Sequence, residues 1–312
     1  MKGHDDGVVT YQNIQRMTEQ QFDKEWLKWH AKREDKLMSK YGWLSLRSID
    51  WLSDGQEVKI AGFPGKWKQQ GNAVSYIPEN GKAVTNRWKI LTAPKTVVVD
   101  SVADVNVEDF DFQGVRAQLI KRIGSDRKFA VRQRDPHSST KRNFTGLPYF
   151  EPDKNWVFPA RYIPLKKWEI LTTASVLGDL SHNETHIGDL YFSFHDEEYR
   201  LVVFQAHNDD SGWLKQDIDG ENNIYLDNRQ NTQGHGTILF RDLTTGAETY
   251  GGGRRIRINI SKPQELDYID FNTAVNLPCA FSSFCTCPFA PSENTLPFKV
   301  RVGETTPKVV TN

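Results

Sequence analysis

A glycine run followed by alternating isoleucines is the feature that most constrains how this chain folds. Positions 251–253 are all glycine, and isoleucine then occupies positions 256, 258 and 260. Successive side chains of a strand point to opposite faces, so this alternation is typical of a strand with one buried face. Three adjacent glycines weaken a strand unless the backbone bends sharply or passes very close to another group. We therefore predict a sharp turn that leads into a half-buried strand.

Arg254 directly follows the glycine run. If the strand begins at Arg254, its guanidinium lies on the isoleucine face. A buried cation without a partner is strongly unfavourable, so a carboxylate such as Asp242 or Asp270 is expected to meet it. The alternative is that Arg254 lies in the turn and is solvated.

A long segment from 272 to 297 carries all three cysteines and several prolines. Such a length without regular periodicity is typical of a functional or tightly folded loop, and its prolines and asparagines favour a rigid cap. The cysteines, Cys279, Cys285 and Cys287, allow three interpretations. They are buried reduced thiols, a Cys279–Cys287 disulfide, or a metal site completed by His235. Their spacing is not a common zinc pattern, so no metal or cofactor is predicted.

The C-terminal third also carries a specific set of motifs. They comprise Asp242, Thr244, Gly246, Thr249, Tyr250, Gly253 and Arg254, then Asp270, Phe271, Asn272, Ala274, Asn276, Pro278, Cys279 and Ala280, and finally Cys287, Pro288, Pro291, Asn294, Leu296, Pro297, Gly303 and Glu304. This pattern resembles the uncharacterised prokaryotic family catalogued as domain of unknown function 1684. Leu277 replaces a proline of the family pattern, and Cys285 is additional. Since that family has no established activity, the resemblance supports the assignment of a site here but implies no function.

An amphipathic helix is predicted within residues 18–38. Thr18 and Gln21 form a capping box, and Phe22, Trp26 and Trp29 recur at helical intervals. We expect these aromatics to dock the helix on a β body; the alternative is that they bind a partner. Residues 1–40 are therefore assigned to an N-terminal arm and helix.

The remaining chain is predicted to be mainly β, built from two packed antiparallel β units, each a sandwich or partly open barrel. Turn signals such as Asp54-Gly55 and Asn80-Gly81 separate short strands in residues 41–140. A proline-rich, aromatic stretch from 136 to 164 marks the boundary. The second unit, residues 141–312, begins with a hairpin of 188–194 and 199–206.

Composition narrows the possible partners. The 312 residues include 40 basic and 40 acidic side chains, 38% hydrophobic residues and only three cysteines. A balanced charge gives no global attraction to nucleic acid or to an anionic membrane. No apolar stretch is long enough for a spanning helix, and few cysteines are typical of a reducing compartment. We expect a cytoplasmic protein without nucleic-acid or membrane partners, and the sequence leaves its oligomeric state open.

Local charge is less even than the total. Nine basic residues fall between Arg116 and Arg142 against Asp126 and Asp135, and an acidic stretch precedes them. The two runs are expected to neutralise each other on a solvated face. The alternative is that Arg132 and Arg134, on one face of one strand, point into an anion-binding cleft.

The histidines offer weaker signals. His182 and His186 with Glu184 between them miss the zinc-protease motif, which needs a glutamate directly after the first histidine. His207 lies beside Asp209 and Asp210, where a histidine can act as a general base or simply be surface.

Two functional hypotheses follow. The first is a binding module for a small anionic or polar ligand in a β cleft lined by Tyr250, Arg254, Asp270, Asn272, Arg132 and Arg134. The second is a hydrolase-like enzyme in which Asp242 or Asp270 works with His207 or His235 as acid or base. In that case Arg254 stabilises developing negative charge.

Overall fold

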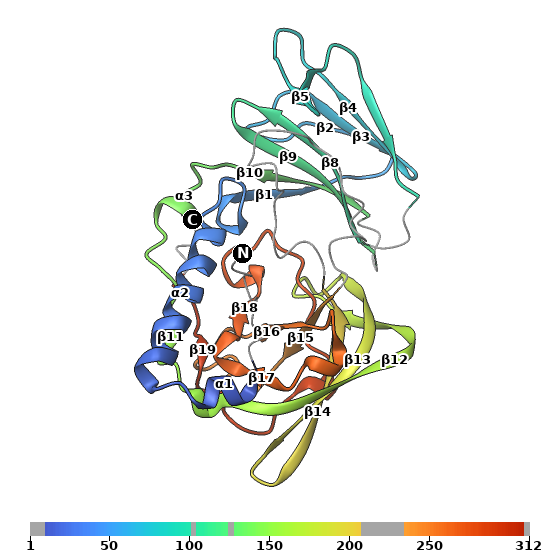
Figure 1. The fold of residues 1–312 in the computed structure, drawn as a ribbon. Helices are drawn as coiled ribbons and strands as arrows, with labels where there is room; N and C mark the ends of the chain where they lie inside the picture. Colours follow the sequence, from blue (N-terminus) through green and yellow to red (C-terminus); the bar gives the residue numbers. More distant parts are fainter. Residues whose placement is uncertain (1–9, 101–103, 124–127, 207–233, 309–312) are drawn as a thin grey trace, which may run out of the picture.

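The computed structural model describes residues 10–100, 104–123, 128–206 and 234–308. The chain is mainly β with a helix near its N-terminus, as predicted (Figure 1). Its named strands form four sheets, all of whose strand pairs are antiparallel, and within the described ranges none closes into a barrel. No helix in these ranges is long and apolar enough to cross a membrane.

Two helices open the described chain: α1 (Tyr11–Gln15) and α2 (Glu19–Leu37). The predicted capping box is present, since Thr18 Oγ1 accepts from Gln21 N and Gln21 Oε1 accepts from Thr18 N. Trp26 is buried, and its Nε1 donates to the carbonyl of Asn272 at 2.8 Å. The aromatic face of α2 therefore docks on the β body, as predicted.

The first β unit is a sandwich of two sheets, at the top of Figure 1. One sheet has the order β1 (Leu46–Trp51), β10 (Phe129–Arg134), β9 (Val115–Lys121), β8 (Val105–Phe112), β5 (Thr85–Asn86), β6 (Lys89–Ile90). The other has the order β2 (Glu57–Val58), β3 (Lys66–Gln70), β4 (Ala73–Ile77), β7 (Lys95–Val98). Trp67, Tyr76 and Phe110 fill the space between them, with ring centroids 4.8–5.1 Å apart.

A larger sheet forms the second unit, at the bottom of Figure 1. Its order is β17 (Tyr268–Asp270), β12 (Val157–Ala174), β13 (Ser181–Phe194), β14 (Glu197–Gln205), β15 (His235–Phe240), β16 (Arg254–Asn259), β18 (Val275–Asn276). Short elements complete the unit: α3 (Ser139–Arg142), η2 (Lys154–Trp156), and the pair β11 (Tyr149–Phe150) with β19 (Gly303–Glu304).

The β13–β14 hairpin confirms the predicted one, but its turn is shorter. The predicted four-residue connection is a two-residue turn, because Glu197 and Glu198 already pair with β13. His195 and Asp196 have φ of 50° and 63°, and this left-handed backbone matches the twist of the flanking strands.

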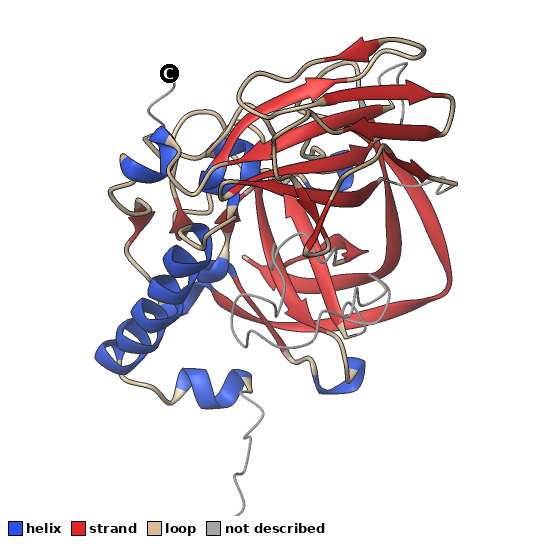
Figure 2. Ribbon diagram, turned by 90° about the horizontal axis from the view of Figure 1, so that it is seen from above, coloured by secondary structure: helices blue, strands red, loops and turns tan. Residues whose placement is uncertain are grey.

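The two faces of the larger sheet pack against different parts of the chain. One face buries Leu190, Phe192 and Ile256 against Phe271 and Val300. The opposite face contributes Val202, Phe204 and Leu239 to a cluster that also contains Trp43 and Leu46. Trp43 lies in η1 (Trp43–Ser45), directly before β1, so this second cluster joins the larger sheet to the first unit. Figure 2 shows this stacking from above, with α2 to one side of the strands.

The cysteine-bearing segment lies at that junction and has little regular structure beyond single turns: η5 (Phe271–Thr273), η6 (Pro278–Ala280) and η7 (Ser292–Asn294). Asn294 anchors the segment with a side chain that is completely buried. Its Oδ1 accepts from Val202 N at 2.7 Å, and its Nδ2 donates to the carbonyls of Val202 and Leu239.

Candidate functional site

Arg254 begins β16 on the isoleucine face of the strand and forms a buried ion pair. Its Nη2 lies 2.7 Å from Asp242 Oδ2, and the two side chains are 1% and 0% exposed. The same guanidinium donates to the carbonyls of Val300 and Val302. Of the two predicted carboxylates, Asp242 is the partner. These contacts join β16 to the C-terminal segment. The partners of the Arg254 guanidinium are a carboxylate and carbonyl groups of the protein.

The last residue of the glycine run explains the sharp turn before β16. Gly253 has φ of +88°, a conformation that L side chains rarely adopt. A Cβ atom here would lie 2.6 Å from the carbonyl oxygen of Phe240. The turn therefore requires glycine at this position because of both its conformation and its close contact.

Asp270 and Asn272 lie together at a different junction, under α2. Asn272 is completely buried; its Nδ2 donates to Asp270 Oδ1 and to the carbonyl of Asp153, and its Oδ1 accepts from Asp153 N. Burial raises the pKa of Asp270 to about 6, although the hydrogen bonds from Asn272 oppose this shift. The two side chains join β17 to η2, and the main-chain carbonyl of Asn272 accepts from Trp26 of α2.

Tyr250, from the glycine-rich turn, meets the cysteine segment. Its side chain packs against the same cluster as Cys279, and Cys279 N donates to Cys287 Sγ at 3.3 Å. All three cysteines are reduced; Cys285 and Cys287 are buried and Cys279 is partly exposed. In the described ranges no group of three or more His, Cys, Asp or Glu side chains is arranged to hold a metal ion.

The three thiols affect one another's pKa values in opposite directions. Burial acts to raise the pKa of Cys287, but hydrogen bonds from the thiols of Cys279 and Cys285, the Cys279 N–H and the charge of Arg255 hold it well below its usual range. The hydrogen bond to Cys287 raises the pKa of Cys279, with burial adding to the effect. Burial raises the pKa of Cys285, and the interaction with Cys287 raises it further.

Arg132 and Arg134 lie on the face of β10 that is turned toward the second unit. Phe129 and Val131 point into the sandwich core, so the alternate side chains face the opposite way. The guanidinium carbons of Arg132 and Arg134 lie 5.7 Å and 4.8 Å from the Trp43 ring centroid. Both arginines also act to lower the pKa of the Cys285 thiol. The structure thus brings the predicted arginine pair to the cysteine segment.

The two arginines differ in their partners. Arg134 Nη1 donates to the carbonyls of Tyr41 and Gly42 at 2.9 and 3.1 Å. Arg132 is only 1% exposed, and its Nε is buried without an acceptor. None of the carboxylates in the described ranges forms an ion pair with Arg132.

Further polar groups of the junction were not identified from the sequence. Gln118, the cross-strand neighbour of Arg132 on β9, is 2% exposed, and its Oε1 has no donor among the described residues. The Nε1 of Trp43 is likewise buried without an acceptor there. Arg122 Nε donates to Thr286 Oγ1 at 2.9 Å and so links β9 to the cysteine segment.

His182 and Asp104 form a second contact between the units. His182 Nδ1 lies 2.6 Å from Asp104 Oδ2, and within the described part of the chain His182 Nε2 is buried without a partner. Thr173, opposite His182 on β12, has an unpartnered buried Oγ1 in the same part of the chain. The residues next to His182 in sequence suggest only a metal ligand, and no local pattern connects His182 with Asp104.

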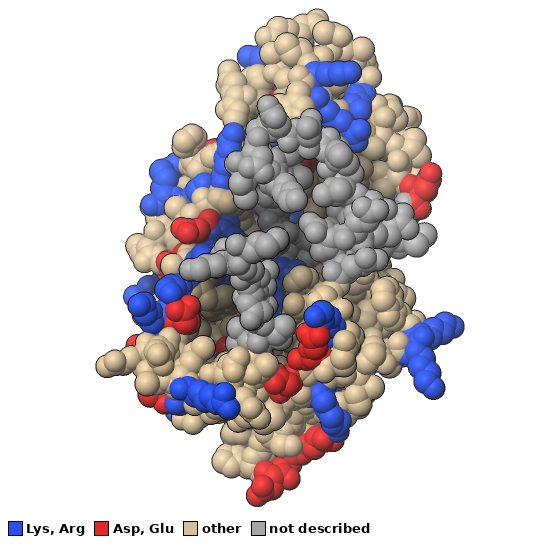
Figure 3. Space-filling model, viewed as in Figure 1, with Lys and Arg blue, Asp and Glu red and all other residues tan. Residues whose placement is uncertain are grey.

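Basic side chains from α2 and β16 gather beside the cysteine segment. Burial lowers the pKa of Lys36, and the charges of Arg257, Arg33 and Arg255 lower it further. Burial and Arg257 also lower the pKa of His235 at the start of β15. Figure 3 shows Lys and Arg atoms and Asp and Glu atoms interspersed over this face of the molecule. His207, the other predicted histidine, lies outside the described residues.

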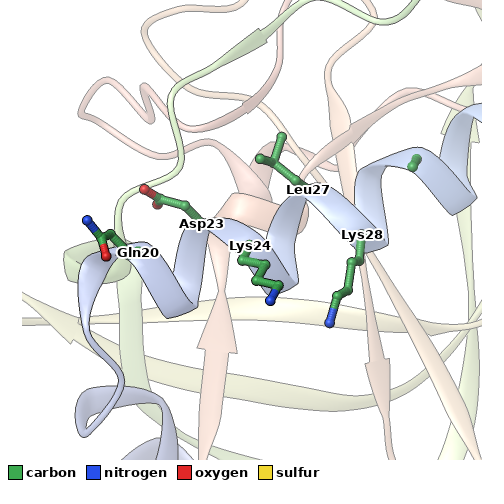
Figure 4. Close-up of a pocket in the computed structure, with 6 residues that line it drawn as sticks. Gln20, Asp23, Lys24, Leu27 and Lys28 are labelled. Carbon is green, nitrogen blue, oxygen red and sulfur yellow. The ribbon is translucent and has the colours of Figure 1, made fainter.

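A separate depression lies on the outer face of α2, far along the sequence from every predicted site residue. Gln20, Asp23, Lys24, Leu27 and Lys28 line it, and their side chains project from one side of the helix (Figure 4). It is wide open to solvent, and no buried polar group converges on it. Its composition is that of an ordinary solvated helix face.

Comparisons with known proteins place the chain in a family. No curated protein matches it. An uncharacterized protein of Haloarcula marismortui, whose structure was solved by NMR in solution, is 25% identical, with a TM-score of 0.38; the alignment covers 55% of this chain and 83% of that one. A family model described as "Protein of unknown function (DUF1684)" matches residues 142–305, more than half of the chain. The protein therefore belongs to the DUF1684 family.

Proposed function

We propose that this protein binds a small anionic or polar ligand at the junction between its two β units, with Arg132 as the principal contact. One observation carries the proposal. The Arg132 guanidinium is 1% exposed, yet it forms no ion pair with the described residues, and its Nε has no acceptor among them.

The burial of the Arg132 guanidinium without a paired anion indicates a ligand. Removing a guanidinium from water costs several kcal/mol unless an anion and hydrogen-bond acceptors replace the lost hydration. Arg254 also has a buried Nε without an acceptor among the described residues, but its guanidinium pairs with Asp242 and donates to two carbonyls. Among the described residues Arg132 has no carboxylate partner, and we infer that an anionic ligand supplies one. A planar guanidinium suits a carboxylate or phosphate group, which it binds through two parallel hydrogen bonds.

The neighbours of Arg132 indicate the chemistry of the ligand. The Trp43 N–H is a buried donor and Gln118 Oε1 a buried acceptor, and both lie beside Arg132. A ligand that satisfies all three groups carries an anionic group and at least one hydroxyl or N–H group. Hydroxy acids and small phosphate esters have this combination.

A hydrolase-like enzyme is the second candidate, supported by the pair His182–Asp104. A carboxylate on Nδ1 orients the imidazole and leaves Nε2 to accept a proton, which is the arrangement of a general base. Asp242 and Asp270 are less suited to that role, because both are engaged in structural hydrogen bonds.

Binding is tested by titrating the protein with inorganic phosphate, citrate, malate and glycerol 3-phosphate by calorimetry. Three proteins are compared: the natural chain, Arg132→Met, and Arg161→Met. Arg161 is a matched control, because its side chain is 52% exposed and pairs with Glu198 at the surface. We expect at least one anion to bind the natural chain and the control but not Arg132→Met. Equal binding to all three proteins, or no binding of any of these anions, contradicts the proposal.

A further inference from the structure

We infer that Cys279 and Cys287 form a peroxide-reactive dithiol, in which Cys287 is the attacking sulfur and Cys279 the resolving one. This inference concerns a modification site and is independent of the proposed ligand. It rests on three thiols that lie together in the cysteine segment, with Arg255 of β16 beside them.

The surroundings of Cys287 favour its thiolate. The sulfur accepts a hydrogen bond from Cys279 N at 3.3 Å and interacts with the thiols of Cys279 and Cys285. Arg255, which is buried on β16, adds a positive charge nearby. A thiolate that is stabilised by donors and a cation is the reactive form toward peroxides.

Cys279 is better placed than Cys285 to act as the resolving cysteine, because of its sequence separation from Cys287 and its exposure. Cys285 is separated from Cys287 by one residue, and a disulfide across so short a span forms a strained ring. Cys279 is eight positions away in sequence, yet its amide lies against the Cys287 sulfur. Cys279 is also partly exposed, whereas Cys285 is 2% exposed. Its thiol can therefore reach Cys287 from the more open side.

The reaction balances with a hydroperoxide as oxidant. The Cys287 thiolate attacks one peroxide oxygen and breaks the O–O bond, which gives Cys287 sulfenic acid and, after protonation, water or an alcohol. The Cys279 sulfur then attacks the sulfenic sulfur and breaks the S–O bond, and its proton leaves with the hydroxide as water. The two thiols lose two electrons in total, and the peroxide gains them.

The test treats the native protein with a small excess of hydrogen peroxide, blocks the remaining thiols, and maps the peptides by mass spectrometry without reduction. We expect an intramolecular Cys279–Cys287 crosslink as the main product, with Cys285 still reduced. Thiol alkylation at pH 6 before oxidation should modify Cys287 about ten-fold faster than Cys285, because the pKa of Cys287 is lowered and burial raises the pKa of Cys285.

Variants make the assignment specific. Cys279→Ser should stop the reaction at Cys287 sulfenic acid, which a 1,3-dicarbonyl reagent traps. Cys285→Ser should still form the crosslink. A crosslink that involves Cys285 in the natural chain overturns the inference. So does a folded protein whose cysteines all stay reduced under peroxide that oxidises free cysteine.

Discussion

Arg254 and Asp242 form an ion pair at 2.7 Å that is almost completely enclosed by protein, with exposures of 1% and 0%. Arg132 is equally buried, but no carboxylate among the described residues pairs with it. Arg254 therefore stabilises the fold through an ion pair, whereas the described residues supply no such pair for Arg132.

Replacement of Arg254 by methionine should be strongly destabilising. The variant leaves the Asp242 carboxylate buried without its cation, and breaking a buried pair in this way costs about 3–5 kcal/mol. Denaturant unfolding measures the loss. Arg301→Met, which removes an exposed arginine that pairs with Glu248, is the matched control and should change the free energy of unfolding by less than about 1 kcal/mol. Equal effects of the two variants would show that the buried pair contributes no more than a surface pair.

Replacement of Arg132 by methionine should instead stabilise the unliganded protein. Methionine fills a similar volume without a charge, so the unliganded variant should gain about 1–3 kcal/mol of unfolding free energy. The comparison is made in a buffer of low anion content, with Arg161→Met expected to lie within about 0.5 kcal/mol of the natural chain. A loss of stability in Arg132→Met would mean that its guanidinium is satisfied by the protein itself.

The raised pKa of Asp270 should make the stability of the protein depend on pH. Its folded pKa is about 6, and an unfolded aspartate has a pKa of about 3.9, so the folded protein binds this proton more tightly. The resulting stabilisation is fully present below about pH 4 and is lost as the pH rises through about 6.

Asp270→Asn tests this dependence, because its Oδ1 can still accept both hydrogen bonds from Asn272. Relative to the natural chain, the variant should gain about 1–3 kcal/mol of unfolding free energy between pH 4 and pH 7. Urea unfolding at a series of pH values measures this difference. A difference that stays constant across this range contradicts the raised pKa.

Asn294 should be the most sensitive anchor of the cysteine segment. Asn294→Ala removes three hydrogen bonds to buried main-chain groups of Val202 and Leu239, and we expect it to cost at least about 3 kcal/mol. Thermal and denaturant unfolding both report the change. Asn183→Ala is the control, since Asn183 is exposed and bonds only the side chain of Thr172. If both variants unfold alike, the anchoring role is wrong.

Much of the fold follows from local patterns. The capping box of Thr18 and Gln21 predicts the start of α2, and the isoleucine alternation predicts that Arg254 lies on the buried face of β16. Electrostatics then predicts a carboxylate partner for Arg254 but does not choose between Asp242 and Asp270; the structure shows Asp242. These predictions succeed because each depends on residues that are close in sequence.

The junction between the units is much less predictable. Arg132 and Arg134 occupy equivalent positions on one strand, and only the carbonyls of Tyr41 and Gly42, brought by the turn after α2, distinguish them. His182 meets Asp104 because of how the larger sheet packs on the first sandwich. Such contacts depend on tertiary packing, which hydrophobic periodicity and secondary-structure propensity do not predict.

Anomalous diffraction from a crystal soaked with selenate, an oxyanion with the geometry of phosphate and sulfate, tests the central claim most directly. We predict an anomalous peak at the junction between the units, within hydrogen-bonding distance of the Arg132 guanidinium, and its loss in Arg132→Met crystals soaked in the same way. Selenate found only at the molecular surface, with protein side chains filling the space around Arg132, would contradict the account.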